Sequence, residues 1–71
     1  SDDDSVRVLD EIVKILDESV KLLKESLKLL DDFLRTKPDD HLKEVVKESK
    51  KVVEQSKKVL DRIKKIIYES K

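Results

Sequence analysis

Apolar residues recur along the first half of the chain at an unbroken spacing of three and four residues. With Val6 taken as position a of a heptad, valine or leucine fills every a position and leucine fills every d position as far as Leu34. The residues of these two rows are Val6, Leu9, Val13, Leu16, Val20, Leu23, Leu27, Leu30 and Leu34. A seven-residue apolar repeat sustained over about four heptads is typical of helices in coiled coils. The repeat therefore predicts a long amphipathic helix.

The single proline, Pro38, lies in a short polar segment between two such periodic halves. Proline disfavours helix at the residue before it and is accepted in the first turn of a helix. Asp39 and Asp40 follow it, and acidic side chains favour the positive end of a helix. We expect one helix over about residues 4–36, a turn at about 36–39 and a second helix over about 38–70. So short a connection makes the helices antiparallel, which predicts a single all-α domain over residues 1–71, a two-helix coiled-coil hairpin.

Four serines interrupt the apolar pattern and suggest how the two helices align. Facing residues of an antiparallel pair have residue numbers with a constant sum, and Ser19 with Ser56 and Ser26 with Ser49 both give 75. This register places position g of the first helix against position d of the second and predicts two polar layers inside the hairpin. The hydroxyls bond either across the hairpin or back to the carbonyl four residues earlier. Either arrangement disfavours slipped pairings.

In this register the apolar face of the second helix is fully used, whereas the a row and part of the d row of the first helix stay uncovered. Leaving that row in water forfeits on the order of 10 kcal/mol, which is comparable with the whole stability of a domain. The nine a and d residues named above are therefore predicted to form an oligomer interface. We expect a homodimer in preference to a trimer, because the b, e and f rows of the first helix are polar. A hairpin of different sequence is the alternative partner.

Opposite charges gather in the two halves of the chain. Residues 1–36 hold ten acids and six bases, and residues 37–71 hold seven acids and eleven bases, so the halves carry −4 and +4 and the chain is neutral. We expect the two e rows to border the open groove and to meet between copies, where their charges favour pairing of unlike helices. These rows are Asp10, Asp17, Lys24 and Asp31, and Lys43, Lys50, Lys57, Lys64 and Lys71.

The residue types for chemistry are sparse. The chain has no cysteine or glycine and one histidine, which excludes a thiol nucleophile, a zinc–cysteine site and a glycine-rich phosphate loop. His41 is expected at the surface, and the acid run at residues 2–4 lacks the spacing of a calcium loop. We expect no enzyme activity, no metal and no cofactor.

Neutral charge and two aromatic residues argue against nucleic acid, and the lack of a long apolar stretch argues against a membrane span. An amphipathic adaptor or lipid-surface binder is the rival to an assembling bundle.

Several stretches together resemble de novo designed helical-hairpin bundles. These are the start SDDDS, the loop TKPDD and the near-perfect heptads VKILDESVKLLKESLKLL and VVKESKKVVEQSKKVL. The resemblance covers all 71 residues and is one of style, since no motif identifies a particular design. It implies a two-helix chain whose function is assembly into homo- or hetero-oligomers. It also implies a synthetic protein with no native compartment, cytoplasmic if expressed in a cell.

Overall fold

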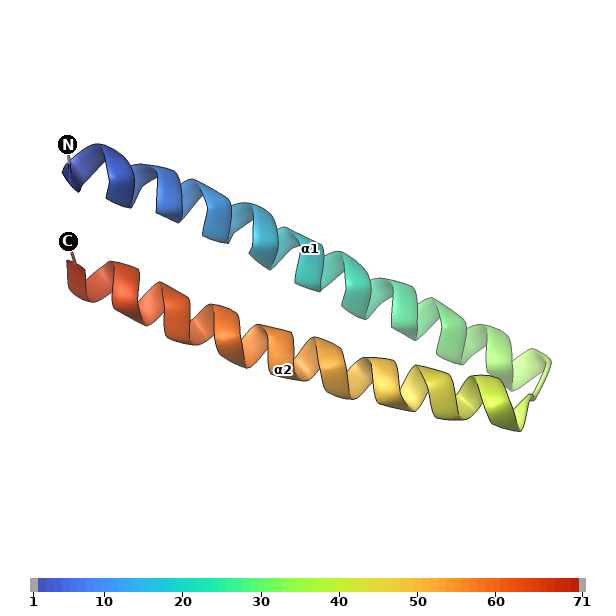
Figure 1. The fold of residues 1–71 in the computed structure, drawn as a ribbon. Coiled ribbons are helices and arrows are strands. Elements are labelled where there is room, and N and C mark those ends of the chain that lie inside the picture. Colours follow the sequence, from blue (N-terminus) through green and yellow to red (C-terminus); the bar gives the residue numbers. More distant parts are fainter. Residues whose placement is uncertain (1, 71) are drawn as a thin grey trace.

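The chain forms an antiparallel helical hairpin (Figure 1). The computed structural model describes residues 2–70, with side chains from Asp4 onward. Helix α1 spans Asp2–Thr36 and helix α2 spans Asp40–Ser70, and the two run side by side along their whole length. The molecule is a rod of 54 × 15 × 12 Å. The predicted all-α hairpin is therefore confirmed.

The turn between the helices extends further on the α2 side than the sequence suggested. Helix α2 begins at Asp40 and not at residue 38, because Asp39 caps it. The backbone N–H of Leu42 donates to Asp39 Oδ1 at 3.0 Å, and that of Lys43 donates to the Asp39 carbonyl at 2.9 Å. This is the geometry of an N-cap residue, so Pro38 precedes the helix and does not enter its first turn. Helix α1 ends at Thr36, as predicted, and begins two residues earlier than predicted.

The core of the hairpin consists of the a rows of both helices. Apart from Val6, which is half-buried, the side chains of these rows are 5–9% exposed and are the buried apolar residues of the described chain. They are Val13, Val20, Leu27 and Leu34 of α1, and Val46, Val53, Leu60 and Ile67 of α2. Residue numbers of matched a positions, such as Val20 and Val53, sum to 73. The two rows therefore face each other in an antiparallel register close to the one predicted, but with both helices turned about their axes.

This rotation corrects the predicted oligomer interface. The a row of α1 was expected to be open to a second copy, and instead Val13, Val20, Leu27 and Leu34 lie between the two helices of one chain, while Val6 is half-buried. The d row of α1 is the part of the predicted interface that remains open. Its members are 43–51% exposed and are Leu9, Leu16, Leu23 and Leu30.

The physical reason for the rotation is that packing a against a uses large side chains in every layer of the core. The predicted register would have placed serine pairs there instead. Packing a against a also brings both e rows to the same side of the hairpin, where their opposite charges can pair within the chain.

We predict that Leu60→Ala lowers the free energy of unfolding by about 2–5 kcal/mol, because it opens a cavity in a core of only a few side chains. Chemical denaturation followed by circular dichroism measures the change. The control is Arg62→Ala, two residues further on at an exposed position, which should change stability by no more than about 0.5 kcal/mol. Equal effects of the two substitutions would contradict the assigned core.

Candidate assembly surface

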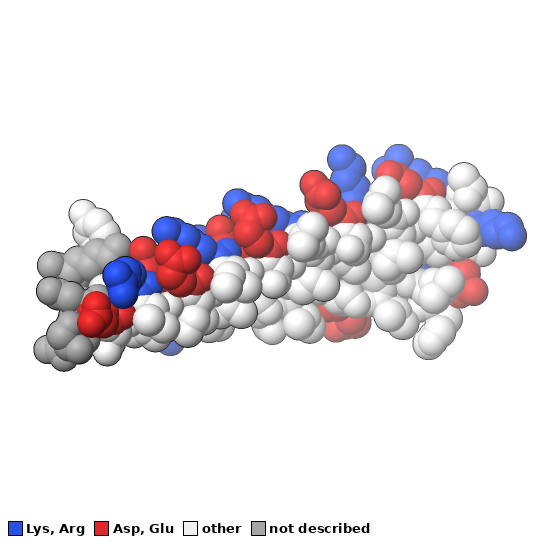
Figure 2. Space-filling view, turned by 90° about the horizontal axis from the view of Figure 1, so that it is seen from above, with Lys and Arg blue, Asp and Glu red and all other residues white. Residues whose placement is uncertain are grey.

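One side of the rod is apolar from end to end. It carries the d and g rows of both helices and the c row of α1, and we call it the apolar face. Its large side chains are 43–69% exposed. They are Val8, Leu9, Ile12, Ile15, Leu16, Leu22, Leu23, Leu29, Leu30 and Phe33 of α1, and Leu42, Val45, Val52, Val59 and Ile66 of α2. Figure 2 shows a strip of uncharged residues along the molecule, with most of the charged side chains in this view along one long edge and a few acidic ones on the opposite edge.

More large apolar side chains lie on this face than in the core. Fifteen belong to the apolar face, against eight that are buried. The accessible surface of the chain is 6024 Å². A compact monomer of this mass would expose about 4,600 Å². The excess, roughly 1,400 Å² per chain, exceeds the approximately 800 Å² that each partner buries in a standard protein–protein interface.

The four central serines belong to the apolar face and not to the inside of the hairpin. Ser19 and Ser26 are exposed on α1, and Ser49 and Ser56 are half-buried on α2. Each hydroxyl donates to the carbonyl four residues earlier in its own helix, at 2.8–3.1 Å. The predicted polar layers between α1 and α2 are therefore not formed within the chain. Of the two bonding arrangements left open by the sequence, the structure has the one within each helix.

We predict that replacing the four serines with alanine leaves the melting temperature unchanged or raises it. Their hydroxyls bond only locally, and alanine has the higher helix propensity. Thermal unfolding followed by circular dichroism at two protein concentrations tests this. A large loss of stability would show that the hydroxyls make bonds between helices. Replacing Ser70, whose hydroxyl bonds the Ile66 carbonyl at the end of α2, serves as the control outside the central layers.

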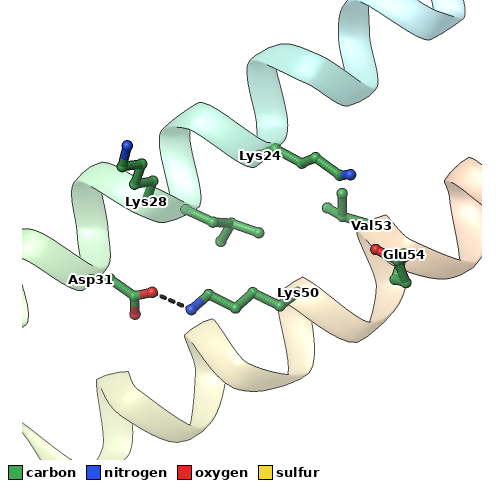
Figure 3. Close-up of a pocket in the computed structure, with 7 residues that line it drawn as sticks. Lys24, Lys28, Asp31, Lys50, Val53 and Glu54 are labelled. Carbon is green, nitrogen blue, oxygen red and sulfur yellow. Dashed lines mark hydrogen bonds and ion pairs between the residues drawn. The ribbon is translucent and has the colours of Figure 1, made fainter.

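The opposite side of the hairpin carries the e rows, which pair within the chain. Asp17 Oδ1 lies 3.0 Å from Lys64 Nζ, and Asp31 pairs with Lys50 in the same way nearer the turn. Figure 3 shows the second pair bridging α1 and α2, with Lys24 reaching toward α2 and Lys28 pointing away from it. The expectation that the e rows meet between copies was therefore wrong for these two pairs.

Asp17 is the carboxylate that this arrangement affects most. The hydrogen bond from Lys64 lowers the pKa of Asp17 below its usual value of 3.8. Desolvation is the next-largest effect and opposes it, and the charges of Lys64 and Lys21 add to the lowering. Lys21 Nζ lies 3.7 Å from Asp17 Oδ2, so two ammonium groups share this carboxylate. Because the ionised form is favoured in the folded state, the pair stabilises the hairpin above the ordinary pKa of aspartate. The stabilisation is lost as the pH falls through the lowered pKa.

We predict that Asp17→Asn lowers stability at pH 7, and that this difference from the parent chain shrinks as the pH falls from 7 through the lowered pKa of Asp17, because the carboxyl of the parent then becomes protonated too. Urea unfolding across this pH range measures the difference. The control is Glu54→Gln, because Glu54 is an exposed carboxylate on the b row of α2, outside the e rows and the apolar face. A pH-independent effect of Asp17→Asn would contradict an ionic role for the residue.

The remaining polar groups do not converge on a chemical site. His41 is exposed in the first turn of α2, and Tyr68 is exposed near its end. Among the described residues, no three His, Cys, Asp or Glu side chains lie together in a way that could hold a metal ion. Over the same part of the chain, neither helix has a stretch long and apolar enough to cross a membrane.

The chain was compared with family models, with characterised proteins and with solved structures, and none of them matches it. The surface must therefore be interpreted from its own geometry. The c row of α1, which is apolar at four successive heptads of the sequence, forms the outermost part of this surface, whereas the register predicted from the sequence would turn that row toward the second helix. These residues are Val8, Ile15, Leu22 and Leu29.

Proposed function

We propose that this chain is a self-assembling helical hairpin whose apolar face packs against the same face of further copies. The observation that supports the proposal is the apolar face itself, which holds more large apolar side chains than the core does. Two copies would form a four-helix bundle, the arrangement that we favour, and three would form a six-helix bundle. The proposal includes no catalytic activity and no bound cofactor.

The free energy available from association is large for a chain of this size. Burying a half-exposed valine, leucine or isoleucine completely gains roughly 1 kcal/mol, so the apolar face as a whole offers on the order of 10–15 kcal/mol per chain. A contiguous apolar strip along the whole rod is also larger than monomeric proteins usually expose. Association is therefore the state that the composition of this surface favours.

A second copy fits the surface better than the other candidate partners. The chain is neutral and carries both signs in separate rows, so one sequence can supply both sides of a complementary interface. The resemblance to designed hairpin bundles, which assemble as homo- or hetero-oligomers, agrees with this. A lipid surface fits less well, because the apolar face is bordered on α1 by an acidic f row, whereas helices that bind membranes carry basic residues there. The f row is Asp4, Glu11, Glu18, Glu25 and Asp32.

We predict that the chain has a solution mass of at least twice its 8.3 kDa at low micromolar concentration. Leu22→Gln with Leu29→Gln should weaken association at least ~100-fold, because both side chains lie on the apolar face. Sedimentation equilibrium measures both quantities. The matched control is Lys21→Gln with Lys28→Gln on the polar b row, which should leave the mass unchanged. A helical species of 8.3 kDa would contradict self-assembly, and helicity gained only with lipid vesicles would favour the lipid-surface alternative.

A further inference from the structure

We infer that the copies dock with their turns at the same end, so that α1 of one copy lies against α2 of the next and the assembly closes as a ring. The inference rests on the proposed self-assembly and specifies which helices meet. The molecule that we infer to cover the apolar face is a second copy of this chain. The observations that carry it are the widths of the two apolar arcs, the register of their rows and the charges along their borders.

The apolar arc of α1 reaches further around the helix than that of α2. On a heptad wheel the c row lies about 150° from the a row, and the g row about 100° from it. Since the a row of α1 already packs on α2, its c and g rows point away from its own partner helix. Helix α2 has apolar residues at a, d and g but a polar c row of Glu48, Gln55, Arg62 and Glu69. The narrow apolar arc of α2 can therefore pack against the broad apolar arc of α1.

The rows also match in register. Each g residue of α2 pairs with a c residue of α1 at a residue-number sum of 74, as in Leu22 with Val52 and Ile15 with Val59. The neighbouring g positions of α1 at these two layers are Ser26 and Ser19. Small serines beside large aliphatic residues leave room for a valine of the next copy to insert between the c and g rows.

The two registers together define the symmetry. Inside the hairpin the matched a rows sum to 73, and the contact proposed between copies sums to 74. Two nearly equal sums mean that successive copies lie at the same height along the helix axis. An interface without a rise closes into a ring, whereas one with a rise would build a filament. The copies are therefore related by a rotation axis parallel to the helices.

The borders of the apolar arcs select α2, and not a second α1, as the neighbour of α1. The acidic f row of α1 lies beside its c row, and the f row of α2 carries Lys51, Lys58 and Lys65. At the proposed height, these lysines lie level with Glu25, Glu18 and Glu11, which gives three opposite-charge layers. The fourth layer places Asp32 level with Glu44.

The alternative contact, α1 against an antiparallel α1, is disfavoured by the same charges. It would place the acidic f rows of two copies side by side, with Glu18 of one copy level with Glu25 of the other. Like charges along an interface oppose association and suppress that pairing. The contact of α1 with α2 of the next copy replaces this repulsion with attraction in three of the four layers.

Cysteine cross-linking tests the docking directly, because the chain has no cysteine of its own. We predict that the double variant L22C/V52C, oxidised by dissolved oxygen with a copper catalyst, forms disulfides from α1 of each copy to α2 of the next. Within one hairpin both positions are exposed on rows that face away from the a-row contact, so we expect no disulfide there, since one requires Cα atoms within roughly 7 Å. The largest species on a non-reducing gel is then a closed covalent ring, and its mass gives the number of copies.

Matched variants separate the possible outcomes. The single variants L22C and V52C should stay uncross-linked, and I15C/V52C, which displaces the α1 thiol by one heptad, should cross-link at least ~10-fold more slowly. A covalent dimer from L22C alone would overturn the inference in favour of α1 on α1. Absence of cross-links in an oligomer of L22C/V52C would overturn it too. If sedimentation of the parent chain gives 8.3 kDa, the proposed self-assembly itself fails, and the docking inference with it.

Discussion

The packing of one a row on the other is the contact on which the rest of this structure depends. Once Val20 and Leu27 of α1 meet Val53 and Val46 of α2, the rotation of both helices about their axes is set. Every other row then has a defined side. The e rows come together on one side, and the d and g rows of both helices come together on the other. The contact between the two a rows therefore lies between a charged side of the hairpin and an apolar side.

These two sides have different roles in the energetics. On the charged side, the pairs Asp17–Lys64 and Asp31–Lys50 connect the helices at the surface, where ion pairs contribute little each but oppose a rotation of one helix against the other. On the apolar side, the exposed side chains contribute little to a single chain and much to an assembly. In the proposed assembly, other copies would cover that side and add stability that a single hairpin lacks.

The sequence predicts the helices, their antiparallel arrangement and the position of the turn, because heptad spacing and Pro38 are local signals. It does not determine which of several adjacent apolar rows faces the partner helix. Rows c, g, d and a of α1 form one continuous arc, and registers that differ by a rotation satisfy the same residue-number sums almost equally well. A constant sum of residue numbers shows which residues lie at the same height along the two helices. It does not show how far each helix is rotated about its own axis. The choice depends on packing volume and on the e-row ion pairs, which exist only in three dimensions.

In the proposed assembly, the serine hydroxyls that bond within their own helices have a consequence for how neighbouring copies recognise each other. A donor that is already satisfied requires no acceptor at a fixed place on another chain, and it can be covered without the cost of an unpaired buried group. Discrimination between neighbours then depends on shape and on the bordering charges. Hairpins with altered side chains at these layers should exchange into mixed assemblies more freely than hairpins joined by a buried hydrogen-bond network.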